Sequence, residues 1–63
     1  MLAAALAKLP ATQRRALVLY HLGQLTVGEI AEQEGVAEGT VRSWLSRGRA
    51  ALAARLDTEV RHV

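Results

Sequence analysis

Between residues 38 and 56 the chain combines cationic and small polar side chains at a spacing that suits contact with a polyanion. On a helix that advances about 100° per residue, one face of this segment carries Gly39, Arg42, Ser43, Ser46, Arg47 and Arg49. The opposite face carries an apolar stripe of Val41, Trp44, Leu45, Gly48, Leu52 and Leu56, which needs a core to lie on. A short cationic face is what a helix needs to reach base edges and phosphates in a DNA major groove. The pattern therefore predicts a recognition helix.

Charge is distributed unevenly along the chain, although the net charge is only +2. Residues 27–36 carry three glutamates and no basic residue, whereas residues 38–55 carry one glutamate against four arginines. Adjacent elements of opposite sign suggest that one of them faces a polyanion. A solvated charged face is the alternative that charge alone leaves open.

The elements that must position this helix begin with two shorter ones. Alanines and regularly spaced leucines predict a helix over residues 2–8. Pro10 is expected to end it and to open a second helix over residues 11–22, because proline lacks an N–H donor and fits a helix start. This second helix is apolar over much of its circumference. We expect it to be the most enclosed element, with Gly23 and Gln24 breaking the pattern after it.

The next helix has recognisable start and stop residues. Thr26 and Glu29 have the spacing of a capping box, which predicts a helix over residues 27–34. Its inward residues are expected to be Val27, Ile30 and Ala31. Gly35 stands where a helix C-terminus takes a residue at positive φ. Because only about three residues then precede the long helix, the two helices must cross steeply as a helix-turn-helix.

Two small residues are expected where helices approach closely. Ala31 falls at the crossing of the third and the long helix, and Gly48 predicts a close crossing against the first or second helix, unless it is simply a tolerated weak position. The fold class predicted is all-α, a four-helix domain over residues 1–56. Residues 57–63 have no clear period and are expected to form a C-terminal tail.

Composition excludes several classes of function. The 63 residues form a single domain and contain no cysteine, which fits a reducing cytoplasm. His21 and His62 are too distant to suggest a metal site, and no apolar run approaches the roughly 20 residues of a membrane span. We find no nucleophile with a base, no carboxylate pair and no cofactor motif. We expect a soluble, unexported protein that is not an enzyme and needs no cofactor or metal.

With these elements laid out, the chain resembles region 4 of the sigma-70 family of bacterial transcription initiation factors, in particular the extracytoplasmic-function (ECF) group. The resemblance runs from about residue 2 to residue 56. Its most specific part is the series Glu29-Ile30-Ala31, Gly35-Val36 and Glu38-Gly39-Thr40-Val41-Arg42-Ser43. Other matching residues are Leu9-Pro10, Gln13-Arg14, Leu17-Val18-Leu19, Leu25-Thr26, Leu45, Arg47, Arg49 and Ala51-Leu52.

The resemblance implies a winged-helix-like DNA-binding fold without a wing, located in the bacterial cytoplasm at the nucleoid. It implies that the domain reads the minus-35 promoter element in the major groove and docks on the β flap of RNA polymerase. An anti-sigma factor is a further implied partner, and no membrane is involved. Nothing in the chain resembles the regions that melt the promoter or bind the polymerase core most strongly, so we expect it to be a piece of a longer protein.

Carried over residue by residue, the positions implied to contact DNA are Gly39, Thr40, Arg42, Ser43, Ser46, Arg47 and Arg49. Arg42 lies in the first turns, which enter a groove deepest, and is the best candidate for a bidentate contact to guanine. Ser43 and Ser46 are short enough to allow close approach. They can bond bases or phosphates.

The remaining positions suit the DNA backbone. Arg47 and Arg49 are expected to grip phosphates and set the register. Gly39 and Thr40 lie near the helix N-terminus, where free N–H groups favour a phosphate, and Glu38 favours the helix start electrostatically. For each arginine the alternative is a solvated surface charge.

Several positions depart from the family pattern. Glu34 stands at a usually apolar position, and either turns outward or pairs with an arginine. Tyr20 stands where a phosphate-contacting arginine is common. Its hydroxyl can donate a hydrogen bond to a phosphate, but it does not supply the positive charge of an arginine. Trp44 replaces an often basic residue, and we interpret it as core or rim rather than as a base-stacking residue. Gly23-Gln24 reverses the expected glycine placement before the turn.

Other hypotheses remain open at this point. Arg14 and Glu29 are candidates for an ion pair joining the second and third helices, or are solvated independently. The output domain of a LuxR-type response regulator has a similar four-helix build. A protein-interaction module bound by an anti-sigma factor or polymerase, with incidental DNA contact, is the alternative from a different class.

Overall fold

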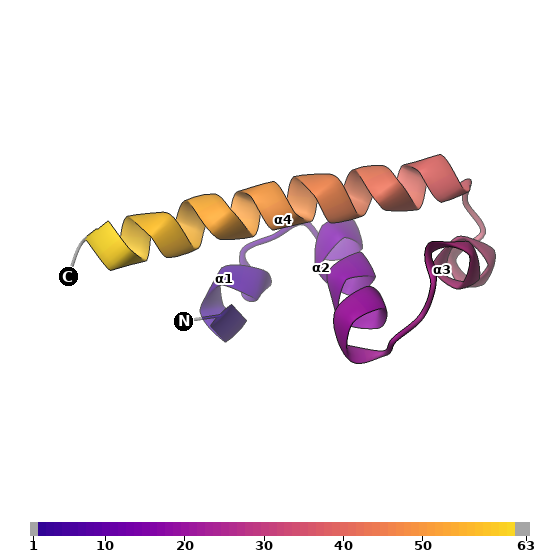
Figure 1. The fold of residues 1–63 in the computed structure, drawn as a ribbon, viewed down its shortest axis with the longest axis horizontal. Coiled ribbons are helices and arrows are strands. Elements are labelled where there is room, and N and C mark those ends of the chain that lie inside the picture. The colour runs from indigo at the N-terminus through magenta and orange to yellow at the C-terminus, as the bar shows by residue number, and fades with distance from the viewer. Residues whose placement is uncertain (1, 62–63) are drawn as a thin grey trace.

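The computed structural model describes residues 2–61, with side chains described for residues 4–56. Figure 1 shows one long helix with all the shorter helices on the same side of it. The elements in chain order are α1 (Leu2–Ala7), α2 (Ala11–Leu17), the π-helical turn η1 (Val18–Leu22), α3 (Val27–Glu34) and α4 (Glu38–Arg61). No strand occurs in residues 2–61, so the predicted all-α, four-helix class is confirmed.

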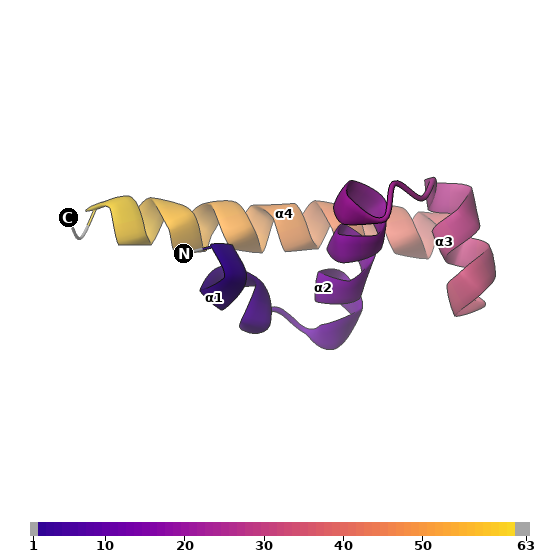
Figure 2. The same ribbon diagram turned by 90° about the horizontal axis from the view of Figure 1, so that it is seen from below.

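Helix α4 is supported at three places along its length. The two ribbon views place α3 under its N-terminal end, α2 under its middle and α1 under its C-terminal half (Figures 1 and 2). The longest extent of the molecule, 41 Å, follows α4. The helix continues past residue 56 to Arg61, so residues 57–61, for which we expected a C-terminal tail, extend α4; residues 62 and 63 lie outside the described part of the chain. The position of the domain boundary stays a prediction.

The helix-turn-helix forms as its start and stop residues predict. The backbone N–H of Thr26 donates to Glu29 Oε1 over 2.8 Å, and the Glu29 N–H donates to Thr26 Oγ1 over 3.1 Å. Gly35 ends α3 with φ +69°, and the Val36 N–H donates back to the Ala31 carbonyl over 3.0 Å. The capping box and the glycine stop therefore fix both ends of α3 before α4 begins.

The core lies between α4 and the three elements beneath it. Ile30 of α3 and Val41 of α4 are completely buried. The buried cluster around them consists of Leu9, Ala16, Leu17, Ala31 and Leu45. Trp44 is half-buried and packs against this cluster, as we expected of a core or rim residue. The apolar face predicted for the long helix is thus the face that packs on the shorter helices.

Helix α2 is less enclosed than its composition suggests. Only Ala16 and Leu17 are buried in α2 and η1 together, whereas Leu22 is 76% exposed and Val18 38%. The prediction that this segment is the most enclosed element is wrong, because α4 covers one side of it and no described element covers the other. In so small a domain there is not enough chain to bury a helix all round.

The turn after η1 explains the unusual glycine placement. Gln24 adopts a left-handed conformation with φ +57°, while Gly23 has φ −80°. A Cβ on Gly23 would lie 2.8 Å from the Leu19 carbonyl oxygen, so this glycine provides room for the end of the π-helical turn. The residue with positive φ in this turn is therefore Gln24 rather than the glycine.

Of the two alternatives considered for Arg14 and Glu29, the ion pair does not form. Glu29 is committed to the capping box, and Arg14 donates to the Ala7 carbonyl over 3.4 Å. Instead, Arg15 Nε lies 3.1 Å from Oε1 and 3.2 Å from Oε2 of Glu34. The second of the two roles considered for Glu34, pairing with an arginine, is therefore the one observed.

Candidate nucleic-acid interface

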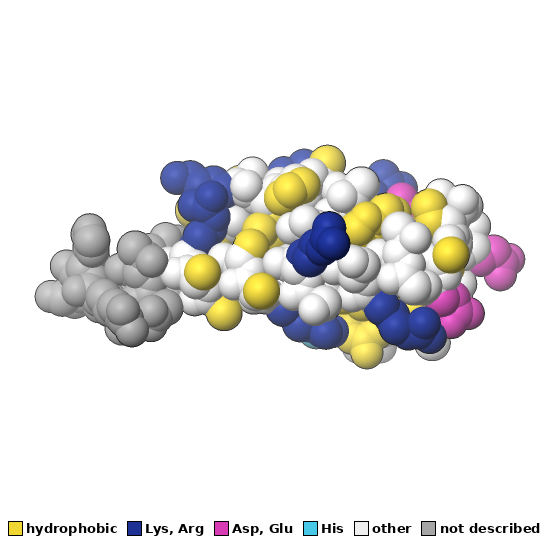
Figure 3. Space-filling view, turned by 90° about the horizontal axis from the view of Figure 1, so that it is seen from above, with side chains coloured by type: hydrophobic (Ala, Val, Ile, Leu, Met, Phe, Trp, Pro, Cys, Tyr) yellow, Lys and Arg dark blue, Asp and Glu magenta, His cyan; other side chains and the backbone are white. Residues whose placement is uncertain are grey.

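The face of α4 turned away from its supports carries the predicted contact residues. Figure 3 views this face and shows basic side chains on both sides of the helix, with acidic side chains gathered at the end nearest α3. Exposed residues here are Gly39, Thr40, Arg42, Ser46, Arg47 and Arg49, and Ser43 is half-buried. All seven predicted positions therefore lie on one helix. Arg42 and Arg49 are at the edge of this face, and Arg49 reaches the supporting element η1 at Tyr20.

Helical geometry divides these residues into a centre and two flanks. Arg42 and Arg49 are two turns apart on one flank, and Arg47 lies roughly 140° away from Arg42 on the other. Gly39, Ser43 and Ser46 occupy the centre between the flanks. The arrangement places small side chains in the middle and cations at the edges, where a helix in a groove would meet the phosphates of the two strands.

Arg42 is held by a residue that we expected to act only on the helix start. Its Nη2 donates to Glu38 Oε1 over 3.0 Å, one turn earlier, with both side chains more than half exposed. Glu38 also lies against α3, because a Cβ on Gly28 would be 3.3 Å from Glu38 Oε2. The carboxylate thus lies beside the start of α3 while it accepts from Arg42. The i, i+4 spacing of Glu38 and Arg42 was sufficient to predict their ion pair.

Arg49 contacts an aromatic ring on another element. Its Cζ lies 5.4 Å from the centre of the Tyr20 ring, within the range of a cation–π contact. Tyr20 in turn meets the ring of His21 edge-on, with centroids 5.0 Å apart and an interplanar angle of 87°. Sequence reasoning missed this contact because the two residues lie on different helices.

The remaining contact candidates are freer. Within the described residues the Arg47 side chain has no hydrogen-bond or ion-pair partner. A Cβ on Gly39 would meet no atom within 4 Å, so the fold itself does not require a glycine there. The Thr40 N–H donates to the Ala37 carbonyl over 3.0 Å, so it is not one of the free N–H groups at the helix start. Its exposed hydroxyl remains available.

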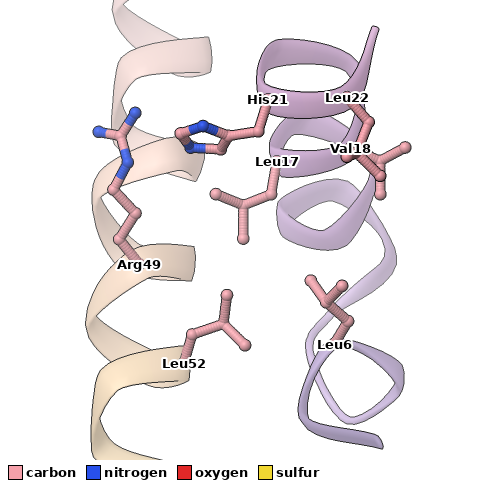
Figure 4. Close-up of a pocket in the computed structure, with 7 residues that line it drawn as sticks. All are labelled: Leu6, Leu17, Val18, His21, Leu22, Arg49 and Leu52. Atoms are coloured by element: carbon pink, nitrogen blue, oxygen red, sulfur yellow. The ribbon is translucent and has the colours of Figure 1, made fainter. Parts of the chain in front are cut away.

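A second surface lies beside Arg49. An apolar groove of about 380 Å³ opens between α1, η1 and α4. Its lining residues are Leu6, Leu17, Val18, His21, Leu22, Arg49 and Leu52. In Figure 4 the side chains of Leu6, Leu17 and Leu52 point toward one another across it, and the ring of His21 points toward Arg49. The groove offers apolar contact area with one cation at its edge.

Other kinds of site find no support in the described part of the chain. No group of three or more potential metal ligands occurs there. No helix described has both the length and the apolar character needed to cross a bilayer.

Comparison with known proteins gives a consistent match. The family model described as "Sigma-70, region 4" matches residues 1–52. Two curated relatives, each named "ECF RNA polymerase sigma factor SigM" and found in Mycobacterium tuberculosis strains Erdman and H37Rv, are 45% identical over 49 residues. The match covers 78% of this chain and 25% of each relative, so the chain spans about a quarter of their length. No solved structure gives a significant match.

Proposed function

The chain belongs to the sigma-70 region 4 family, and from this premise we propose that it binds the minus-35 promoter element as the region 4 domain of an ECF-type sigma factor. Helix α4 enters the major groove with its first turns. The role is recognition rather than catalysis, and it is carried out in the bacterial cytoplasm on nucleoid DNA.

The observation that carries this proposal is the sidedness of α4. Val41 and Leu45 are buried, while Arg42 and Ser46 are exposed and Ser43 is half-buried. The same turns that anchor the helix therefore present its polar residues outward. Arg42 exchanges the Glu38 carboxylate for O6 and N7 of a guanine, and the two serines allow the backbone to approach the bases.

Phosphate contacts fix the register of the helix. Arg47 grips one strand from its flank, and Arg49 grips the other. Gly39 lets the helix start approach a phosphate closely, and the Thr40 hydroxyl donates to the same region. Contacts of this type add affinity that depends on salt and carries little sequence information.

The partner proteins proposed are the RNA polymerase core, through its β flap, and an anti-sigma factor that competes for the domain. The flap occupies the apolar groove lined by Leu6, Leu17 and Leu52. This groove lies beside the α4 face proposed for DNA and shares only Arg49 with it. DNA and the flap are therefore proposed to meet the domain on neighbouring surfaces, with Arg49 at the boundary between them.

A selection experiment tests the proposed DNA role. The 63-residue chain is used to enrich duplexes from a random-sequence pool, and the enriched duplex is compared with unrelated duplexes by fluorescence anisotropy over a salt series. Enrichment of one motif with a clear preference for it supports promoter recognition. Equal affinity for all duplexes favours the protein-interaction module with incidental DNA contact.

A further inference from the structure

The contact between Tyr20 and Arg49 joins two elements that flank the proposed DNA surface. Tyr20 belongs to η1 and Arg49 to α4, and the guanidinium carbon lies 5.4 Å from the ring centre. His21 packs edge-on against the same ring at 5.0 Å. The Tyr20 ring therefore contacts His21 edge-on and Arg49 at its face.

This contact leaves the hydrogen-bonding capacity of Arg49 unused. Within the described residues no carboxylate pairs with Arg49, whereas Arg15 and Arg42 each pair with a glutamate. A guanidinium that lies over an aromatic ring keeps its N–H donors at its edge. Both Arg49 and Tyr20 are exposed, so these donors are open to a ligand with acceptor oxygens.

The place of the pair favours a phosphate as that ligand. Tyr20 lines a shallow pocket with Thr26 and Val27, at the start of α3. Arg49 lies two turns beyond Arg42 on the same flank of α4. In Figure 3 a hydrophobic side chain separates basic side chains along one edge of this face. A DNA strand whose bases meet Arg42 would run along this edge.

We infer that Tyr20 is a positioning residue, which holds the Arg49 guanidinium over its ring and thereby forms a phosphate clamp between η1 and α4. The inference rests on the proposed DNA-binding function. A free arginine side chain loses rotamer freedom when it binds, and the ring restricts that freedom in advance. Tyr20 carries no charge, so the electrostatic part of the contact comes entirely from Arg49.

The test is a double-mutant cycle on the 63-residue chain with a short random-sequence duplex as probe, measured by anisotropy over a salt series. Tyr20→Leu should weaken binding about two- to fivefold, as expected for an exposed cation–π contact, and Tyr20→Phe should leave binding unchanged. Arg49→Ala should lower the salt slope by about one. In the Arg49→Ala background, Tyr20→Leu should have no further effect.

Several outcomes would overturn the inference. One is that Tyr20→Leu is silent or that its effect persists without Arg49; another is that Tyr20→Phe weakens binding as much as Tyr20→Leu. Lys8→Ala, which removes an exposed charge from the chain segment after α1, is the matched control and should leave binding unchanged. Melting curves separate a folding effect from a binding effect. If the unmodified chain shows no sequence preference in the selection experiment, the proposed function fails. If it prefers one motif but the effects of Tyr20→Leu and Arg49→Ala are additive, only the clamp fails.

Discussion

The side chain of Leu17 lies directly against the backbone of Gly48, where α2 crosses the middle of α4. A Cβ on Gly48 would be 2.9 Å from Leu17 Cδ1 and 3.5 Å from Gln13 Cβ. Leu17 is itself buried, so its methyl group has little room to move. This crossing sets the angle at which α4 leaves the core and hence the direction in which its polar face points.

Filling this crossing should destabilise the domain. We expect Gly48→Val to lower the free energy of unfolding by about 1–3 kcal/mol, because a packed core tolerates added methyl groups poorly. Ala50→Val, on the exposed face of the same helix, is the matched control and should cost less than about 1 kcal/mol. Thermal denaturation followed by circular dichroism measures both, and equal effects would show that the crossing is loose.

The turn before α3 holds a removable strain. Gln24 has φ +57°, a conformation that costs a side-chain-bearing residue roughly 1–2 kcal/mol and glycine little. We expect Gln24→Gly to raise the free energy of unfolding by about 1 kcal/mol, measured by chemical denaturation. Gln33→Gly, inside α3, should have the opposite sign. A loss of stability in Gln24→Gly would mean that the glutamine side chain contributes a contact worth more than the strain.

Gly39 should separate stability from binding. Its Cβ position is empty and exposed, so Gly39→Ala should stabilise the helix by about 0.5–1 kcal/mol. The same methyl group would lie between the helix start and the DNA backbone. We expect DNA affinity to fall by about 1 kcal/mol, roughly fivefold, in anisotropy titrations. Unchanged affinity would mean that DNA does not approach this turn.

Glu38 should restrain binding to unrelated DNA. Its carboxylate holds Arg42 at 3.0 Å and places a negative charge near the proposed phosphates. We expect Glu38→Gln to increase affinity for unrelated duplexes by about 1 kcal/mol, and to lower the free energy of unfolding by about 0.5 kcal/mol through loss of the helix-start charge. Glu32→Gln makes the same charge change on an exposed position of α3, and its affinity should stay close to that of the unmodified chain.

Local signals in the sequence were sufficient for much of the fold. The capping box at Thr26, the stop at Gly35 and the apolar stripe through Val41 each depend on neighbours within one or two turns, and the structure confirms them. Gly48 indicated a close crossing, but the sequence left open which helix it meets. The resemblance to sigma-70 region 4 was inferred from short local motifs, and the family model matches residues 1–52.

The features that the sequence left open or missed are contacts between elements. Arg14 and Arg15 are adjacent in the chain, and only the rotation of α2 decides that Arg15 reaches Glu34. The contact of Arg49 with Tyr20 depends on the π-helical turn, which sequence periodicity did not predict. The exposure of Leu22 reflects the absence of a covering element among the described residues. Such features depend on tertiary placement, which a helical pattern does not contain.

The central claim is that Arg42 reads a base while Arg47 holds the backbone, and one comparison tests it directly. The affinity of the Arg42→Ala and Arg47→Ala chains is measured on the selected duplex and on each of its single base-pair variants over a salt series. Arg42→Ala should abolish discrimination at one base pair, a loss of about 1–3 kcal/mol there. Arg47→Ala should weaken all duplexes alike and lower the salt slope by about one. If Arg42→Ala keeps the full discrimination of the unmodified chain at every position, α4 is not the base-reading helix as described.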